Sequence, residues 1–111
     1  MKIHYSSEKQ EKLLNSSKEL TKKFGSENAG KVRRRMDDLR AAQQLETMRM
    51  LPGRTHELHG GRAETFAIDL HKGWRMIFEP ADDPPPRKPD GGLDWSQITE
   101  IRILELEDYH E

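Results

Sequence analysis

The chain opens with alternating apolar and polar residues, which is the pattern of a short β-strand. Met1, Ile3 and Tyr5 are separated by Lys2 and His4. An alternation of period two places successive side chains on opposite faces of a strand. The spacing of apolar residues becomes helical immediately afterwards, so we expect a short first strand followed by a helix.

Two helices are predicted in the first half of the chain. The first begins after Ser7, which forms a capping-box pattern with Gln10, and ends at Gly25 about four turns later. The second has Ser26 as its N-cap and ends near Leu51-Pro52-Gly53, where Pro and Gly cannot continue it. The short connection between them favours an antiparallel helical hairpin. Apolar residues recur at helical spacing in both: Leu13, Leu20, Phe24, Ala29, Val32, Met36 and Leu39.

The second half of the chain returns to alternation of period two. Residues 66–70 and 74–78 alternate on either side of a turn at 71–73, which predicts a β-hairpin. The last strand begins near Ile101 and changes phase at Leu104, which indicates either burial on both faces or a β-bulge. We therefore predict an α+β fold in which two N-terminal helices pack on a mainly antiparallel β-sheet.

A Pro-rich loop separates the hairpin from the last strand. Residues 80–92 hold five of the six prolines in the sequence. We interpret this segment as a loop at a hairpin tip, not a linker, because the strand after it needs the preceding sheet as a partner. Residues 1–111 therefore form a single domain. The loop either contacts a partner molecule or is inert surface.

Composition restricts the class of protein. Hydrophobic residues make up only 32% of the chain and the net charge is −1, so we expect a folded domain with a thin core. Cysteine is absent, which excludes disulfides and thiol chemistry and fits a reducing compartment. No apolar run exceeds three residues, which is too short for a membrane span. We therefore expect a cytoplasmic protein with no membrane partner.

The small net charge conceals a strong asymmetry. Residues 1–78 hold 16 Lys and Arg against 10 Asp and Glu, a net charge of +6, whereas residues 79–111 hold 3 against 10, a net charge of −7. A basic body can offer a positive face to nucleic acid. The alternative is ordinary solvated surface charge.

Two segments carry candidate chemistry for phosphate and proton transfer. Alternation places Trp74 and Arg75 on opposite faces of a strand, so Arg75 can grip a phosphate with its planar guanidinium or form a surface ion pair. Asp108, Tyr109 and His110 form a run of proton-carrying side chains. Cleavage of RNA by its own 2′-hydroxyl needs a base, an acid and a cation for the phosphate oxygens. The alternative is a polar chain end.

Histidines raise the question of a metal site. His56, His59, His71 and His110 are candidate ligands. Residues three apart on a strand point to opposite faces, and no cysteine is available as a ligand. We therefore predict neither a metal nor a cofactor, and keep a small metal-binding enzyme as the third hypothesis.

Five segments follow one another in a specific order: Asp38-Leu39-Arg40-Ala41-Ala42, Leu51-Pro52-Gly53-Arg54-x-His56-Glu57-Leu58, Gly60-Gly61-Arg62, Trp74-Arg75-Met76-Ile77-Phe78-Glu79-Pro80 and Asp108-Tyr109-His110. Their combination, over about residues 30–80 and 98–110, closely resembles the HigB-like branch of the RelE/ParE toxin superfamily. Proteins of this branch are also described as plasmid maintenance or killer proteins. The resemblance implies a RelE-like fold and a bacterial type II toxin that cuts mRNA in the ribosomal A site. It also implies a helix-turn-helix, HigA-like antitoxin as partner.

The resemblance also implies roles for individual residues. His56, Arg75, Asp108, Tyr109 and His110 match functional positions of the family, and His59 stands where the family usually has a lysine beside the phosphate. Candidate contacts to RNA phosphates are Arg54, Arg62 and Lys72. A second departure is Gly73, which replaces the usual asparagine before Trp-Arg.

A hypothesis from a different class remains open. The departures at His59 and Gly73 are also those expected of a non-catalytic binding protein. That protein would be either a degenerate toxin kept for its antitoxin complex or a ParE-like inhibitor of a DNA topoisomerase. Damage to mRNA would support the endoribonuclease hypothesis. Altered DNA topology would support the ParE-like inhibitor.

Overall fold

A five-stranded sheet forms the centre of the computed structural model, which describes residues 1–109. The strand order is β1-β5-β4-β3-β2. β1 runs parallel to β5 and the other neighbours are antiparallel, so the predicted α+β class is confirmed and the sheet is mixed. The strands are β1 (Lys2–Tyr5), β2 (His56–Glu57), β3 (Phe66–Asp69), β4 (Trp74–Pro80) and β5 (Glu100–Asp108).

The predicted first helix is wrong in one respect, because the chain forms two helices there. α1 (Glu8–Leu14) begins after Ser7, whose hydroxyl accepts the N–H of Gln10 as predicted. Asn15 follows α1, and its side-chain amide donates to the carbonyl of Glu11, one turn back. Ser16 then caps α2 (Ser17–Phe24) by accepting the N–H of Glu19. Ser16 is therefore a second capping serine, and it starts a new helix where one continuous helix was predicted.

The predicted second helix is shorter than expected. α3 (Ser26–Ala41) begins with Ser26 inside it, and Gly25 is the residue that precedes it, at φ 88°. After α3 the chain becomes extended at Ala42 and then forms a 3₁₀ helix, η1 (Leu45–Met50). Backbone bonds from Leu45 to Ile98 and from Glu46 to Trp95 tie η1 to the segment before β5. Tertiary contacts with a distant segment therefore end the helix earlier than its own sequence does.

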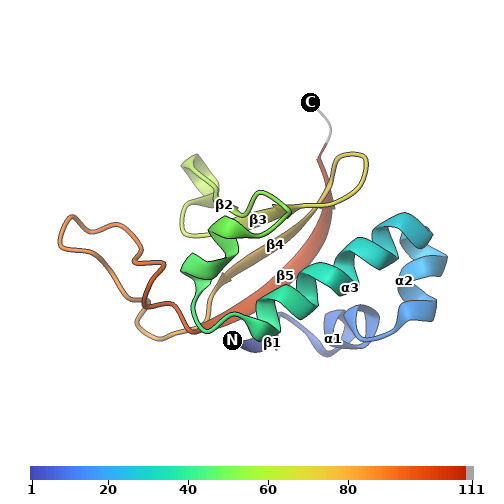
Figure 1. The fold of residues 1–111 in the computed structure, drawn as a ribbon, viewed down its shortest axis with the longest axis horizontal. Coiled ribbons are helices and arrows are strands. Elements are labelled where there is room, and N and C mark those ends of the chain that lie inside the picture. The colour runs from blue at the N-terminus through green and yellow to red at the C-terminus, as the bar shows by residue number, and fades with distance from the viewer. Residues whose placement is uncertain (110–111) are drawn as a thin grey trace.

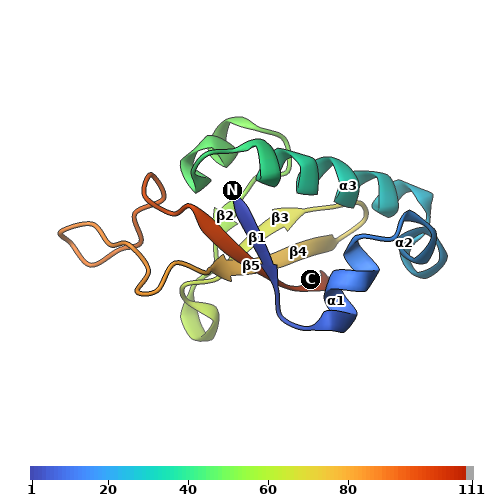
Figure 2. The ribbon, with the colours of Figure 1, turned by 90° about the horizontal axis from the view of Figure 1, so that it is seen from below.

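α3 and η1 lie over one face of the sheet, and within residues 1–109 a short segment around residue 60 crosses the opposite face. Figures 1 and 2 show α3 lying along one side of the strands, with the 3₁₀ helix η2 (Gly60–Arg62) on the other side. Side chains of α2 and α3 meet the strands in one apolar core. Its largest fully buried members are Leu20, Met36, Leu39, Leu45, Met48, Phe66, Ile68, Met76, Phe78, Ile98 and Ile101.

The β3–β4 hairpin and the bulge in β5 determine which side chains lie on the face of the sheet opposite α3. Phe66 pairs with Phe78 and Asp69 with Arg75, which confirms the predicted hairpin. Along β5 the register shifts by one residue, so that Ile103 opposes Phe78 while Glu105 opposes Ile77. The phase change at Leu104 is thus a β-bulge, the second of the two predicted alternatives.

Residues 81–99, between β4 and β5, form a projecting arm that contains the Pro-rich loop. The arm extends from one end of the molecule in both ribbon views (Figures 1 and 2). It is attached at its base, where Asp82 accepts the backbone N–H groups of Thr99 and Glu100. Part of the arm returns to the core through Leu93, Trp95 and Ile98, which are buried. Within residues 1–109, no helix is both long and apolar enough to cross a membrane.

Candidate active site on the open face of the sheet

Alternation along the strands places charged side chains on the sheet face that the helices leave uncovered, which we call the open face. Met76 and Phe78 belong to the core on the helix side, so Arg75 points to the opposite face. Cross-strand pairing adds Asp69 on β3 and Glu107 on β5 to the same face, on either side of Arg75. Three ionisable residues therefore lie in a row across the sheet.

Arg75 is held by a carboxylate that it shares with a second arginine. The Nε of Arg75 lies 2.7 Å from Oε2 of Glu107. Arg62, from η2, donates through Nη1 to both oxygens of Glu107 at 2.7 and 2.9 Å, and its Nη2 lies 3.7 Å from Glu105. Arg75 is only 8% exposed. We call these four residues the arginine cluster; its two positive and two negative charges balance.

The environment of Glu107 favours its charged form. Partial burial acts to raise the pKa of this carboxyl group, but hydrogen bonds and charge attraction from Arg75 and Arg62 outweigh it. The pKa of Glu107 is therefore lowered from its ordinary value of 4.5. Near neutral pH the carboxylate holds both guanidinium groups in place.

Tyr109 covers the arginine cluster at the end of β5. Its ring lies over the guanidinium of Arg75, 3.9 Å from carbon Cζ to the ring centroid. The backbone N–H of Tyr109 donates to the carbonyl of Gly73 at 2.7 Å, which fixes this part of the chain beside the β3–β4 turn. Tyr109 is 46% exposed, so part of this residue lies at the surface beside Arg75.

The other two residues of the terminal motif are placed differently. Asp108 pairs with Trp74, and alternation directs it to the helix side of the sheet, away from Arg75 and Tyr109. His110 lies outside the described residues. The structure therefore brings Tyr109, but not Asp108, onto the face that carries Arg75.

His56 lies on the open face at the outer strand β2. It pairs with Ala67, whose other partner is Ile77, so one strand, β3, separates His56 from β4, and two inter-strand spacings give a distance of about 10 Å. Its Nδ1 lies 2.7 Å from the carbonyl oxygen of Arg54. A carbonyl can only accept, so Nδ1 carries the proton, and Nε2 of the neutral ring is then an acceptor. His56 is thus prepared to take up a proton at Nε2.

A tight turn holds Arg54 beside Asp69. Arg54 donates from Nε and Nη2 to the two oxygens of Asp69 at 2.7 and 3.3 Å. This hydrogen bond and the charge of Asp69 raise the pKa of Arg54. Gly53 precedes it at φ +107°, and a Cβ there would lie 2.7 Å from Cγ2 of Ile68 and 3.1 Å from Cδ of Arg35. Glycine is therefore required for the turn to pack on α3.

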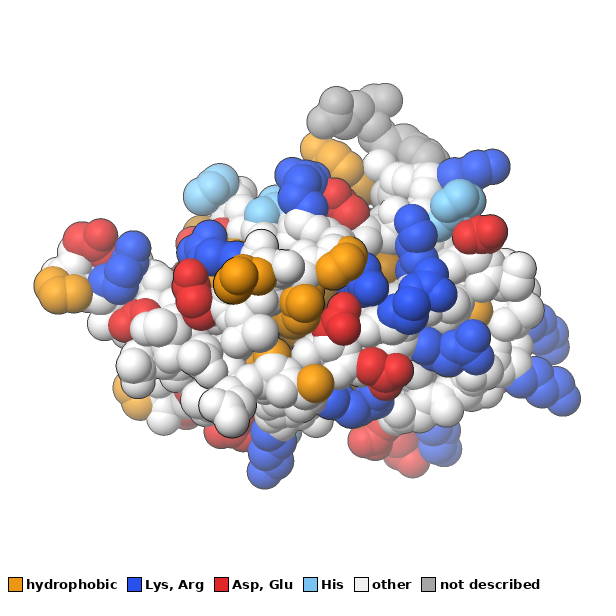
Figure 3. All heavy atoms as spheres, viewed as in Figure 1, with side chains coloured by type: hydrophobic (Ala, Val, Ile, Leu, Met, Phe, Trp, Pro, Cys, Tyr) orange, Lys and Arg blue, Asp and Glu red, His pale blue; other side chains and the backbone are white. Residues whose placement is uncertain are grey.

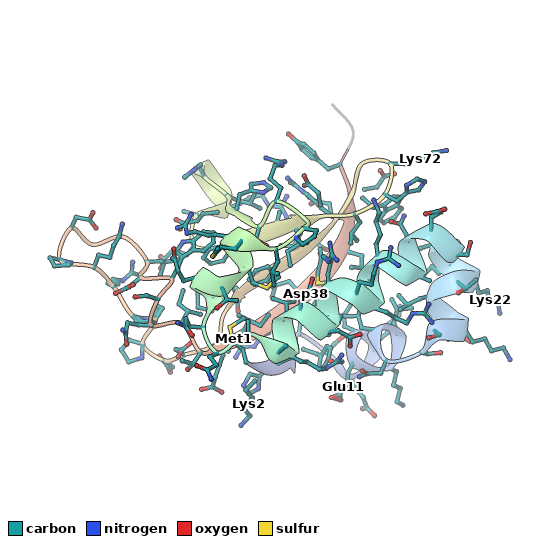
Figure 4. The ribbon with its side chains drawn as sticks, in the orientation of Figure 1. Met1, Lys2, Glu11, Lys22, Asp38 and Lys72 are labelled. Carbon is teal, nitrogen blue, oxygen red and sulfur yellow. The ribbon has the colours of Figure 1, made fainter. Side chains whose placement is uncertain are left out.

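His59 and Lys72, the remaining predicted residues, lie apart from the arginine cluster. His59 precedes η2 and lines a pocket of about 370 Å³ together with His56. Lys72 lies in the turn between β3 and β4, and its side chain points away from the body of the protein (Figure 4). Among residues 1–109, no group of three or more His, Asp and Glu side chains is arranged to hold a metal ion.

A basic groove runs between α3 and the turn that contains Arg54. It has a volume of about 510 Å³ and its charged lining consists of Lys31, Arg34, Arg35, Arg54 and Asp69. Lys and Arg side chains gather over α3 and α2 on the face seen in Figure 3. Because Asp69 both belongs to the open face and lines this groove, the two features are continuous.

Sequence reasoning missed Glu107, the residue that organises the arginine cluster. Glu105 and Glu107 are two apart on a predicted strand, which indicates a shared face. The acidic pair was therefore detectable, but its opposition to Arg75 depends on a strand register that the sequence does not specify.

The sequence matches no known protein-family model and no curated protein. Membership of the HigB-like branch therefore stays a prediction from the motifs.

Proposed function

We propose that this protein is the toxin of a type II toxin-antitoxin system, with a RelE-like fold, and that it acts in the cytoplasm as a ribosome-dependent endoribonuclease on mRNA. The observation that carries the proposal is the arginine cluster. Arg75 is nearly buried on an open sheet face, fixed by Glu107, flanked by Arg62 and covered by Tyr109. A fixed guanidinium beside an aromatic ring suits a phosphate that has a nucleobase next to it.

The proposed reaction is attack of a 2′-hydroxyl on the adjacent phosphate. A base removes the hydroxyl proton, the 2′-oxygen bonds to phosphorus, and the 5′-oxygen leaves with a proton from an acid, which yields a 2′,3′-cyclic phosphate and a 5′-hydroxyl. Arg75 and Arg62 stabilise the negative charge that develops on the phosphate oxygens. Glu107 already binds Arg75 at Nε, and the terminal nitrogens of the guanidinium are further donors.

His56 and Tyr109 are the proton-transfer candidates among the described residues. The acceptor Nε2 of His56 suits the role of base for the 2′-hydroxyl. The hydroxyl of Tyr109 suits the role of acid, because its ring already lies against Arg75. His110 is a further candidate for the acid. A phosphate over β3 would lie between His56 and Arg75, which reach the open face from either side of that strand.

The experiment that tests this function is mRNA cleavage mapped at nucleotide resolution, on mRNA-programmed ribosomes and on free mRNA. Arg75→Lys is the informative variant, because it keeps a positive charge opposite Glu107 but loses the planar guanidinium. We expect cuts within the A-site codon only when ribosomes are present, and roughly 100-fold slower cleavage by Arg75→Lys. Arg40→Lys is the matched control and should cleave normally, since Arg40 lies on α3, where it pairs with Asp37.

A second function is favoured by one feature of the same site. Glu107 and Glu105 already neutralise Arg62 and Arg75, as expected if the arginines have a structural role in a non-catalytic binding protein. In that case wild type and Arg75→Lys would both fail to cut mRNA on either substrate, while the protein would still bind its helix-turn-helix antitoxin. Relaxation and supercoiling assays would then decide whether a DNA topoisomerase is the target.

A further inference from the structure

The pocket that His56 and His59 line lies where the arm meets the edge of the sheet. It has a volume of about 370 Å³, within the range of small-molecule sites. Three separate segments form it: η1, the β2 region and the arm. Its lining residues with charged or titratable side chains are Arg49, His56, Glu57, His59 and Lys88. Four of these five can carry positive charge, so the pocket favours an anionic ligand.

The single carboxylate of the pocket is already occupied. Glu57 accepts the indole N–H of Trp95 at 3.2 Å, and Trp95 is 6% exposed. The guanidinium of Arg49 lies over the Trp95 ring, with Cζ 3.6 Å from the ring centroid, and its Nε forms an ion pair with Glu46 at 3.0 Å. Trp95 and Glu46 thus hold Arg49 at the pocket. A guanidinium plane of this kind is one on which nucleobases stack.

The arm contributes Lys88 through a tight turn. The N–H of Lys88 donates to the carbonyl of Gly92 at 2.8 Å, and the N–H of Gly91 donates to the carbonyl of Lys88 at 2.9 Å. A Cβ at Gly92 would lie 3.4 Å from Cε and 3.8 Å from Nζ of Lys88, so the lysine side chain passes directly over this glycine. Its ion pair with Asp90 is long, at 3.8 Å, and therefore weak. The ammonium group is available to a stronger anion.

From these contacts we propose that the pocket is a nucleotide subsite. A base stacks on Arg49, and Lys88 with His59 contacts the phosphate. This inference rests on the proposed function for its place in the reaction: because His56 belongs both to this pocket and to the open face, the nucleotide held here neighbours the one that is cleaved. The arm then serves to grip the substrate strand.

The binding test uses a non-cleavable RNA trinucleotide, methylated at its 2′-oxygens, and follows the indole N–H signals by NMR. Trp95 reports on the pocket, and Trp74, which packs edge-on against Phe24, serves as the internal reference. We expect the trinucleotide to shift the Trp95 signal and not the Trp74 signal. Adenosine and inorganic phosphate, titrated separately, should each shift it more weakly, since each supplies only part of the ligand.

Three variants locate the contacts. Lys88→Gln removes the charge. Gly92→Ala keeps it but places a Cβ 3.1 Å from Oδ1 of Asp90, which disturbs the tight turn that carries the lysine. Each should weaken trinucleotide binding roughly five- to tenfold. Lys88→Gln should also lower the slope of log affinity against log salt by about 0.7. Arg49→Lys should abolish the effect of adenosine and retain that of phosphate. Lys22→Gln, the same charge change on α2 at the opposite end of the molecule (Figure 4), should bind normally.

The outcomes separate this inference from the proposed function. An unmoved Trp95 signal, or equal losses in Lys88→Gln and Lys22→Gln, would overturn the subsite. A shift caused by an acidic peptide but not by the trinucleotide would overturn it in favour of a protein ligand. If wild type cleaves mRNA on ribosomes and the Lys88 and Gly92 variants cleave equally well, the subsite is likewise refuted. Trinucleotide binding lost in those variants, without any cleavage by wild type, would support the subsite and contradict only the proposed reaction.

Discussion

Glu107 converts two arginines on a sheet face into a defined site. One of its oxygens binds Arg75, and both bind Arg62. Without this carboxylate, the guanidinium groups of Arg75 and Arg62 would lose the negative charge that they share. A neutral amide at the same position can accept a hydrogen bond but cannot balance their charge.

We therefore predict that Glu107→Gln lowers the free energy of unfolding by about 1 to 3 kcal/mol at pH 7. The loss should depend on pH in a defined direction. Because the pKa of Glu107 is lowered in the folded protein, its stabilising effect is complete above the ordinary value of 4.5 and is lost as pH falls through the lowered pKa. Urea unfolding from pH 7 down to acid should thus show the two proteins converging as Glu107 becomes protonated.

Glu105→Gln is the control for this measurement. Glu105 is half exposed and lies 3.7 Å from Arg62, so its replacement should change stability by less than about 0.5 kcal/mol. Equal effects of the two substitutions at all pH values would contradict the central role of Glu107.

The exposure of Arg75 to an anion could be predicted from the sequence, whereas its pairing with Glu107 could not, for a physical reason. Arg75 follows a tryptophan in an alternating strand, so its face and its freedom to meet an anion are local properties. The partner of Arg75 is determined by the register of β5, which is more than twenty-five residues away in the sequence. Asp108, a predicted site residue of the terminal motif, lies on the other face because side chains alternate along β5.

At the scale of elements, the bulge at Leu104 decides which face the acidic residues occupy. It lets Ile103 and Leu106 both point into the core although they are three residues apart. Glu105 and Glu107 consequently reach the open face. With Leu104 in the chain, a strand of regular pleat could not place both these core residues and these carboxylates on their present faces.

Deletion of Leu104 should remove the bulge without changing the faces of β5. If residues 100–103 keep their pairing, residues 105–107 keep their present partners on β4 in a strand of regular pleat. We expect the deletion to lower the free energy of unfolding, measured with urea, by less than about 2 kcal/mol. Insertion of one alanine after Leu106 should instead turn Glu107 toward the helices and cost roughly 3 kcal/mol or more. An insertion variant as stable as the deletion variant would show that the register of β5 does not hold Glu107 on the open face.

The helical region shows what local patterns can and cannot predict. The hydrophobic spacing correctly placed helices before the hairpin, and Ser7 was correctly predicted as a cap. The break at Ser16 was missed because the apolar stripe continues across it. The early end of α3 was missed because it depends on bonds between η1 and the arm, which no local pattern contains.

At the scale of the whole molecule, the charge asymmetry of the sequence places basic and acidic surfaces in different regions of the protein. The basic groove on α3 continues into the open face at Asp69 and Arg54, whereas the base of the arm has an acidic pocket lined by Glu64, Glu79, Asp82 and Asp83. A polyanion, such as the RNA substrate that we propose, would be attracted to the first region and repelled from the second. The fold therefore favours binding of an anion at the basic groove over the base of the arm, which the net charge of −1 does not reveal.

The double variant Lys31→Gln, Arg34→Gln tests this path. Two phosphate contacts on a single strand contribute about 1.4 to the slope of log affinity against log salt, so the variant should lower the slope by that amount. Binding of a single-stranded RNA at several salt concentrations measures it. Lys9→Gln, Lys12→Gln on α1 is the matched pair, and an equal change in both would mean that the groove has no special role.

The position of β5 has a consequence for how the protein is made. β5 is the last described strand to be synthesised, yet it lies between β1 and β4 and supplies Glu107 to Arg75. A chain leaving the ribosome folds from its N-terminal end, so β1 and β4 must wait for their common neighbour. The nascent chain has all the arginines of the site but no means of fixing them. The arginine cluster can therefore form only after β5 has left the ribosome and joined the sheet.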